Sequence, residues 1–139
     1  MIVLSNEETL SKLKRIIQEF TDSQSDVQGQ IVITYPGGVP IVNTWKGGEI
    51  DPILVGAISA AVKLTFRYLC EQLRKGILKK LYINSDYGRV IIQDAGPKAI
   101  LTSIIDKEAD LFRIAFGMTN LAIELEKLLE DFILEVSDI

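Results

Sequence analysis

The sequence predicts an α+β domain in which a helix, a two-stranded hairpin, a long helix, three further strands and a last helix follow one another. Three observations carry this prediction. Two β-branched runs flank the turn Pro36-Gly37-Gly38, an apolar segment fills residues 52–75, and a sustained amphipathic stripe runs through residues 111–132. A chain of 139 residues fits one domain. We therefore expect a single domain over residues 1–139, with its core at about residues 5–134.

The first helix is expected over residues 6–20. Ser5 with Glu8 three residues later forms a capping-box pattern. The apolar residues that follow at helical spacing are Leu10, Leu13, Ile17 and Phe20. A polar connector leads to the first hairpin, whose strands are expected at 31–35 and 39–45. Pro36 presets its own φ, and the two glycines tolerate positive φ, so the chain reverses between these strands.

The long helix is expected over residues 52–75, because Asp51 is a good N-cap, Pro52 suits the first helical position and Gly76 ends the pattern. A helical projection separates two apolar stripes. The bulky stripe, expected to lie on the sheet, is Val55, Ile58, Val62, Phe66, Leu69 and Leu73. The second stripe, which contains smaller residues, is Ile53, Ala57, Ala60, Leu64 and Tyr68. Small side chains in this second stripe would let another backbone approach closely.

Three strands and a helix complete the prediction. The strands are expected at 77–84, 89–94 and 98–105, with the turn residues 84–88 joining the first two. The last helix, over residues 111–132, has one apolar stripe opposite Glu and Lys. Hydrophobic residues make up 47% of the chain, which is high for a small domain, so part of the apolar surface is expected to meet a partner.

Composition argues against several functional classes. A formal net charge of −4 argues against a nucleic-acid-binding protein, because such proteins neutralise phosphates with clustered Lys and Arg. The chain has no His, the commonest general base, and no phosphate-binding loop. Asp106, Glu108 and Asp110 alternate as a calcium loop begins, but Leu111 stands where that loop needs Gly. We therefore expect no catalytic residue, no metal and no cofactor.

No segment resembles a membrane span or a secretion signal. Lys63 and Arg67 interrupt the best apolar run, and the first four residues are too short for a signal peptide. Cys70 is the single cysteine, which excludes an intramolecular disulfide and fits a reducing compartment. We expect a cytoplasmic protein with no direct membrane insertion.

The order of elements, together with short sequence matches, resembles the Roadblock family, the dynein light-chain type of domain that also occurs in bacterial polarity regulators and in archaea. The matching features are residues 31–34 running into 37–42, the helix through Ala57, Ala60 and Ala61, residues 84–88 before 90–92, and residues 109–111 leading into the last helix. Phe112 departs from the pattern, because family members often have a small residue there.

This resemblance implies a profilin-like fold. Its five-stranded antiparallel sheet would carry the long central helix on one face and the N- and C-terminal helices on the other. It also implies dimerisation through the third strand and the central helix. The residues then expected at the dimer or partner interface are Ile53, Gly56, Ala57, Ala60, Ala61, Leu64, Arg67, Tyr68, Lys79 and Lys80.

The resemblance also implies the leading functional hypothesis, a non-enzymatic homodimer that is a platform for, or regulator of, a small Ras-like GTPase. An alternative is an adaptor or scaffold subunit of a larger motor-like or membrane-associated complex. A third hypothesis is a small-ligand sensor with a pocket beneath the central helix. Trp45 fits an interface or the core equally well, and Lys63 and Arg67 fit either an acidic partner or plain solvation.

Overall fold

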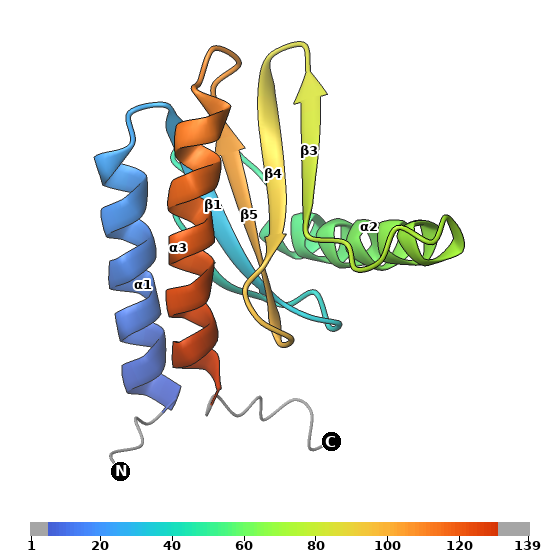
Figure 1. Cartoon of the computed structure of the whole chain (residues 1–139). Coiled ribbons are helices and arrows are strands. Elements are labelled where there is room, and N and C mark those ends of the chain that lie inside the picture. Colours follow the sequence, from blue (N-terminus) through green and yellow to red (C-terminus); the bar gives the residue numbers. More distant parts are fainter. Residues whose placement is uncertain (1–5, 131–139) are drawn as a thin grey trace.

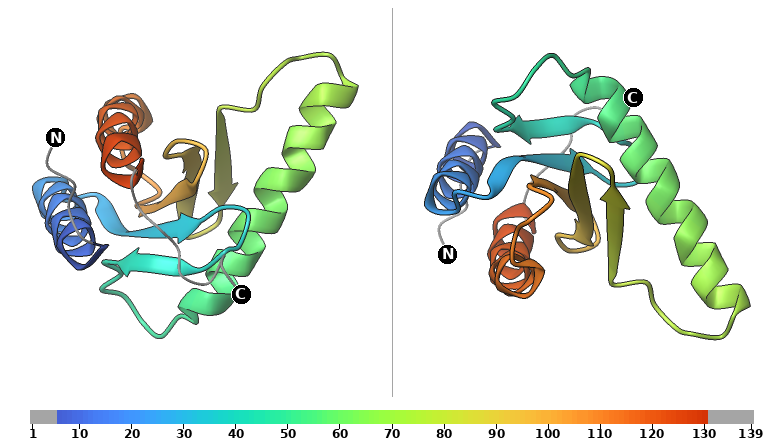
Figure 2. Two further views of the ribbon diagram at one scale, coloured as in Figure 1. Left: turned by 90° about the horizontal axis from the view of Figure 1, so that it is seen from below. Right: turned by 90° about the horizontal axis from the view of Figure 1, so that it is seen from above.

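A five-stranded antiparallel sheet separates one long helix from a pair of helices in the computed structural model, which describes residues 6–130 (Figure 1). The elements are α1 (Asn6–Ser23), β1 (Val27–Thr34), β2 (Pro40–Asn43), α2 (Pro52–Gln72), β3 (Lys80–Ser85), β4 (Gly88–Asp94), β5 (Ala99–Ile105) and α3 (Leu111–Leu129). Helix α2 lies on one face of the sheet, and α1 and α3 lie side by side on the other (Figure 2). The predicted fold class and element order are confirmed.

The strands follow one another across the sheet in the order β2-β1-β5-β4-β3. All neighbouring strands are antiparallel, so β1 and β5 form the centre while β2 and β3 form the two edges. Within the part of the chain that the structure describes, β3 pairs with β4 alone. The outer side of β3 therefore presents backbone N–H and C=O groups that have no strand beside them.

The two faces of the sheet carry cores of different size. The fully buried side chains between the sheet and the pair α1 and α3 include Leu13, Ile17, Ile91, Leu101, Ile105, Ile114, Met118 and Leu125. Under α2 the buried cluster is only Ala60, Ile92 and Ile100, with Tyr35, Val62, Leu81 and Val90 packed around it. Because hydrophobic stabilisation scales with the apolar area removed from water, α2 is held to the sheet by less apolar contact than α1 and α3 are.

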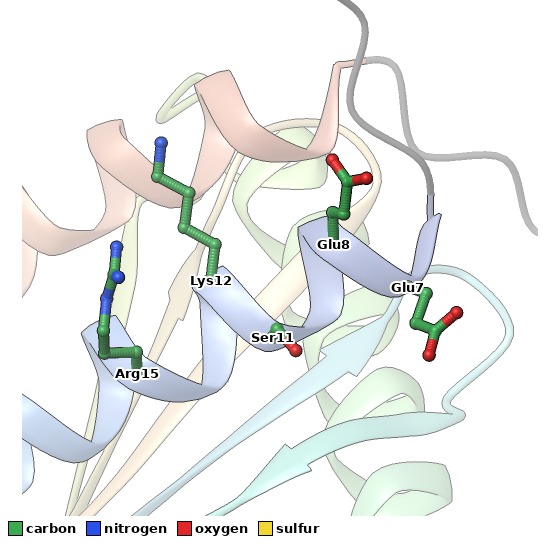
Figure 3. Close-up of a pocket in the computed structure, with 5 residues that line it drawn as sticks. All are labelled: Glu7, Glu8, Ser11, Lys12 and Arg15. Carbon is green, nitrogen blue, oxygen red and sulfur yellow. The ribbon is translucent and has the colours of Figure 1, made fainter.

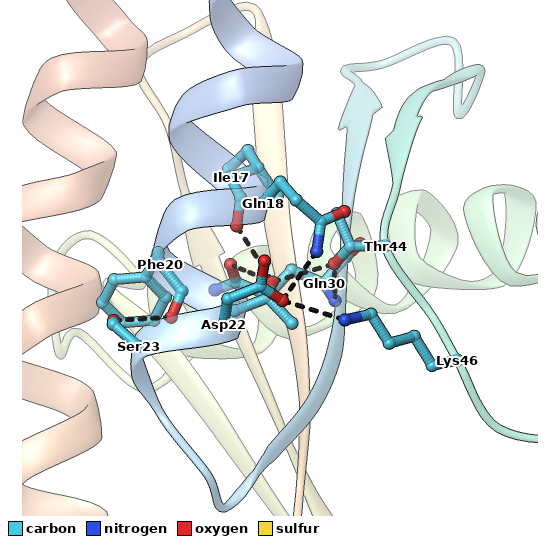
Figure 4. Close-up of polar contacts among 9 residues, drawn as sticks. Ile17, Gln18, Phe20, Asp22, Ser23, Gln30, Thr44 and Lys46 are labelled. Carbon is cyan, nitrogen blue, oxygen red and sulfur yellow. Dashed lines mark hydrogen bonds and ion pairs between the residues drawn. The ribbon is translucent and has the colours of Figure 1, made fainter.

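A buried polar network joins the end of α1 to the sheet (Figure 4). Gln30 on β1 donates from Nε2 to Ser103 Oγ at 2.8 Å, and the hydroxyls of Thr21 and Thr44 lie 2.9 Å apart. Nearby, Lys46 Nζ is 2.9 Å from the Asp22 carboxylate. This hydrogen bond, supported by one from Gln18, lowers the pKa of Asp22 below its ordinary value. The buried hydrogen bonds among Thr21, Gln30, Thr44 and Ser103 fix the end of α1 in one position on the sheet.

Several predicted boundaries were wrong. Strand β1 begins at Val27 and not at residue 31. The sequence pattern missed its first residues because Gly29, which packs against Trp45, and Gln30, which is buried in the polar network, do not continue the apolar alternation. Helix α2 ends at Gln72 and β3 begins at Lys80, so the chain between them is an irregular connection. The proposed N-cap Ser5, and residues 131–134 of the expected core, lie outside the described residues.

An ion pair ties α3 to the turn after α1. Arg113 Nη2 lies 2.5 Å from Asp26 Oδ2, and Arg113 also donates to the side-chain oxygen of Gln24. The hydrogen bond from Arg113 lowers the pKa of Asp26 below its ordinary value of 3.8, although partial burial acts in the opposite direction. A carboxyl group whose pKa is lower in the folded state stabilises the fold above the unfolded-state pKa and ceases to do so as pH falls.

We predict that Arg113→Gln lowers the free energy of unfolding by about 1 kcal/mol at pH 7, since this pair is only partly shielded from water. The difference from the wild type should shrink as pH falls below about 4, because the unfolded chain then takes up a proton on Asp26 before the folded wild type, with its lowered pKa, does. Urea unfolding at several pH values measures it. Arg15→Gln, on the exposed face of α1, is the control and should change stability by less than about 0.5 kcal/mol at any pH. A constant difference down to pH 3 would contradict the assignment.

Candidate interaction surface

The described residues do not assemble a metal centre. Among residues 6–130, no group of three or more His, Cys, Asp or Glu side chains is placed to hold a metal ion. A shallow hollow of about 650 Å³ lies on α1, and all five residues that line it come from that helix (Figure 3). They are Glu7, Glu8, Ser11, Lys12 and Arg15. One helix face that is open to solvent offers no second wall against which a substrate could be oriented.

Helix α2 touches the sheet through a narrow face of mostly small residues. Its buried positions are Gly56, Ser59, Ala60 and Lys63. The prediction that the bulky stripe lies on the sheet was therefore wrong: Val55 and Val62 are half-buried at the margin of the contact, while Ile58, Phe66, Leu69 and Leu73 are exposed. The sheet contact falls between the two predicted stripes, so each stripe forms one flank of the helix.

A close backbone contact explains why the small face is turned inward. A Cβ atom on Gly56 would lie 2.3 Å from the carbonyl oxygen of Gly38 in the β1–β2 turn. Gly38 has a φ of +75°, a conformation that glycine adopts without strain, and a Cβ there would lie 3.1 Å from the oxygen of Gly56. Bulky side chains on this face would hold the helix away from the hairpin. The close contact therefore requires glycine both in the β1–β2 turn and on α2.

Lys63 adds an electrostatic contact to the same face. Its ammonium nitrogen lies 2.6 Å from Asp94 Oδ1 at the end of β4 and 3.6 Å from the ring centroid of Tyr35. The side chain of Lys63 is 9% exposed and that of Asp94 is 38% exposed. From the sequence, Lys63 was expected either to be solvated or to contact an acidic partner. Both predictions were wrong, because this lysine is paired with Asp94 inside its own domain.

The outward flanks of α2 and the neighbouring edge of the sheet form a large apolar surface, which we name the α2–β3 surface. Its exposed large hydrophobic residues are Ile53, Leu54, Ile58, Leu64, Phe66, Tyr68, Leu69, Leu73, Ile77 and Ile83. Exposure reaches 74% for Ile53 and 84% for Ile77. The C-terminal part of α2 extends past β3, away from the rest of the sheet (Figure 2). Many exposed large apolar side chains on one helix and the adjoining sheet edge indicate an interaction site.

The ten residues expected at the interface do not share one environment. Ile53, Ala57, Ala61, Leu64, Tyr68 and Lys79 are exposed, and Arg67 is half-buried beside Glu71, 3.5 Å away. Gly56 and Ala60 are buried against the chain's own hairpin and sheet. Lys80 is turned to the opposite face, where Nζ donates to the carbonyl of Ala115 and the hydroxyl of Thr119. Ala60→Glu would thus disturb the fold before it reports on any partner.

The two ends of α2 carry opposite charges. Glu49 and Asp51 are exposed at its N-terminal end, where Asp51 accepts the N–H groups of Ile53 and Leu54. Beyond its C-terminal end the exposed cations are Arg74, Lys75 and Lys79. A hollow of about 620 Å³ lies open there, lined by Arg67, Glu71, Arg74, Gly76 and Ile77. It lies at the end of the helix and not beneath it, where the ligand-sensor hypothesis placed a pocket.

Trp45 belongs to its own loop. Its indole N–H donates to the carbonyl of Gly48 at 2.6 Å, and its backbone packs against Gly29. Its half-buried ring is therefore already engaged within the chain.

By length and composition alone, α2 could cross a membrane: its most apolar window has a mean hydropathy of 1.5, and 22% of that window is buried. The core helix of a soluble protein can pass the same test.

Sequence reasoning missed the exposed apolar residues on the other side of the sheet. Phe112, Phe116 and Ile123 lie on α3 with 90%, 72% and 51% exposure, but the sequence pattern treats α3 as having a single apolar stripe. The signal that could have revealed them is their spacing at positions 112, 116 and 123, which is itself helical.

Comparison with solved structures agrees with this architecture. The Myxococcus xanthus MglB structure has 13% sequence identity and a TM-score of 0.82, over 97% of this chain and 98% of that one. A Roadblock/LC7 domain from Streptomyces avermitilis has 12% identity and a TM-score of 0.73, over 84% and 96%. LokiProfilin1, from a complex with rabbit actin, has 19% identity and a TM-score of 0.57, over 85% and 96%. The chain has the profilin-like Roadblock fold.

No protein-family model matches the chain, and no curated protein sequence matches it either. At identities below 20% over these three structures, the likeness extends to the fold.

We predict that Lys63→Met lowers the free energy of unfolding by about 2 kcal/mol, because it leaves Asp94 without its partner at a partly shielded site. Lys79→Met removes an exposed lysine of the same size and should cost less than about 0.5 kcal/mol. Urea unfolding followed by circular dichroism measures both. Equal stability of the two variants would mean that the Lys63 contact with Asp94 and Tyr35 does not hold α2 on the sheet.

Proposed function

We propose that this chain is a non-enzymatic, cytoplasmic interaction module that forms a homodimer and is a platform for a small Ras-like GTPase. The observation that carries the proposal is the α2–β3 surface, where exposed aliphatic and aromatic side chains adjoin the open edge of β3. A monomer would leave this surface in water, at a cost that grows with its apolar area.

Self-association through α2 and β3 would cover both the exposed side chains of α2 and the open edge of β3. Pairing of β3 with its copy would give the free backbone groups at the sheet edge their hydrogen-bond partners. The part of α2 that extends past β3 would then lie over the sheet of the second copy (Figure 2). A further MglB structure, with 12% identity and a TM-score of 0.82, is described as having a tetrameric arrangement, which supports self-association.

The charges at the two ends of α2 favour an antiparallel arrangement of the paired helices. In that orientation the acidic end, with Glu49 and Asp51, meets the basic end of the second helix, with Arg74 and Lys75. A parallel arrangement would place like charges together, which disfavours association. Lys79 would lie near the same junction, whereas Lys80 is held by α3 and takes no part.

Two arguments support a platform over an enzyme. The chain has no His and no phosphate-binding loop, so it has no evident means to bind or hydrolyse nucleotide by itself. The Roadblock fold, which the MglB and MglC structures share with this chain, is that of an interaction domain. A scaffold subunit in a larger assembly, with no GTPase involved, is the second candidate, since an apolar surface beside a sheet edge fits that role as well.

We predict that Tyr68→Glu converts the dimer to a 15.5 kDa monomer at micromolar concentration, because it places a carboxylate in the centre of the exposed flank of α2. Tyr87→Glu is the matched control: Tyr87 is 95% exposed in the β3–β4 turn, and this variant should keep the mass of a dimer. Light scattering across a concentration series measures the mass. A wild-type chain that stays at 15.5 kDa at high concentration would contradict homodimerisation.

We predict that Arg67→Glu weakens GTPase binding about tenfold, or about 1.4 kcal/mol, since charges at an interface rim steer and orient a partner. Arg15→Glu, on α1 across the sheet, should bind as the wild type does. Calorimetric titration against candidate GTPases loaded with GDP or a GTP analogue measures the affinity. Failure of every GTPase to bind would favour the scaffold role, and direct binding of GTP by this chain alone would overturn the assignment.

A further inference from the structure

A small hollow lies between α3 and the edge strand β3, on the opposite side of the sheet from α2. Helix α3 packs against β4 and β5, and β3 continues the sheet beyond the helix. The hollow has a volume of about 200 Å³. Its floor is the fully buried Ile91 of β4, and its walls are Tyr82, directly opposite Ile91 on β3, and Leu111 at the start of α3.

A cation lies at each end of this hollow. Lys80 precedes Tyr82 by two residues, so both belong to one face of β3, and Lys80 Nζ lies 3.2 Å from the carbonyl oxygen of Ala115 on α3. At the other end Arg89 lines the hollow and donates from Nη1 to the carbonyl oxygen of Ala109, at 3.3 Å. We name the hollow, together with Lys80 and Arg89, the β3–α3 groove.

Neither cation is neutralised within the described part of the chain. Both donate to backbone carbonyl oxygens, which carry no net charge, and no carboxylate among residues 6–130 lies within ion-pair distance of either one. Asp110, which follows Ala109, already accepts the N–H of Arg113 as the N-cap of α3. The β3–α3 groove therefore keeps two positive charges, although the chain as a whole has a net charge of −4.

We propose that the β3–α3 groove binds an extended acidic segment of a partner protein, with two carboxylates four residues apart and an apolar side chain midway between them. Lys80 and Asn84 are about 13 Å apart along β3, and Arg89 lies opposite Asn84. An extended chain covers this distance in four residues and turns residues i, i+2 and i+4 to one side. The outer two then meet the cations, and the middle one meets the hollow.

Aromatic side chains beside the hollow support an apolar residue at the middle position. Tyr82 is 55% exposed, and Phe112, which follows Leu111 on α3, is 90% exposed. Tyrosine and arginine are among the residue types that contribute most to binding at protein interfaces. The hollow has room for one aliphatic side chain but not for a helix, whose diameter is about 10 Å. Its size therefore favours an extended segment over a helical one.

The β3–α3 groove and the proposed dimer use different parts of β3. The groove uses side chains on the α3 side, and Lys80 is held there by its contact with α3. The dimer would use the outer backbone edge of β3 and the α2 side of the sheet. Peptide binding therefore does not rest on the homodimer or on a GTPase, and the Tyr68→Glu variant should bind the peptide with the affinity of the wild type.

The experiment is a fluorescence-anisotropy titration of the full chain against the labelled peptide Gly-Ser-Glu-Ser-Leu-Ser-Glu-Ser-Gly. The wild type should bind saturably, and more weakly as salt is added, because both charged contacts are near the surface. Arg89→Gln should raise the dissociation constant at least tenfold with an unchanged circular dichroism spectrum. Arg15→Gln makes the same change in net charge on the exposed face of α1 and should bind as the wild type does.

Changes in the peptide test the recognition without any change in the protein. Replacing both Glu residues of the peptide by Gln should weaken binding at least tenfold. The peptide Gly-Ser-Glu-Glu-Leu-Ser-Ser-Ser-Gly, which has the same composition but adjacent carboxylates, should also bind at least tenfold more weakly. Equal binding of the three peptides, no saturable binding by the wild type up to millimolar concentration, or wild-type affinity in Arg89→Gln would overturn the proposal.

Discussion

The close contact between Gly56 of α2 and Gly38 of the β1–β2 turn is the constraint on which the exposed surface of this molecule depends. It lets the helix approach the sheet at the N-terminal half of α2, and only a face without bulky side chains can make that approach. The face that remains available for contact is narrow, so the apolar residues on either side of it cannot be buried by the same sheet. A helix held in this way keeps its larger side chains in solvent unless another molecule covers them.

The single buried charge on α2 completes this arrangement. Lys63 lies one turn beyond Ala60, on the same face, and reaches Asp94 at the end of β4 while its ammonium group rests on the ring of Tyr35. Apolar contact under α2 is limited to a small cluster, so a directional contact has more influence on where the helix lies than it would in a large core. Lys63 is the last buried position of α2, and the C-terminal part of the helix extends past β3 (Figure 2).

Sequence periodicity predicted the elements and their order because each helix and strand has a pattern of its own, from the β-branched run of β1 to the apolar stripe of α3. It could not predict which face of α2 meets the sheet. Both stripes of α2 are apolar, and the face that meets the sheet lies between them because Gly56 packs against Gly38, a residue distant in the sequence. The pairing of Lys63 with Asp94 is equally remote from local pattern, and for this reason Lys63 was assigned to the surface from the sequence.

The exposed apolar residues of α2 and those of α3 arise from the fold in different ways. Exposure on α2 follows from a narrow sheet contact, whereas α3 has a broad buried stripe with Ile114, Met118 and Leu125 and carries its exposed phenylalanines on the side opposite to that stripe. Phe112 and Phe116 contribute nothing to holding α3 on the sheet, and for a small domain such exposed aromatic side chains are a liability in water. The fold needs neither phenylalanine for its own core, so the apolar exposure of α3 has a different origin from that of α2, whose exposed side chains flank its contact with the sheet.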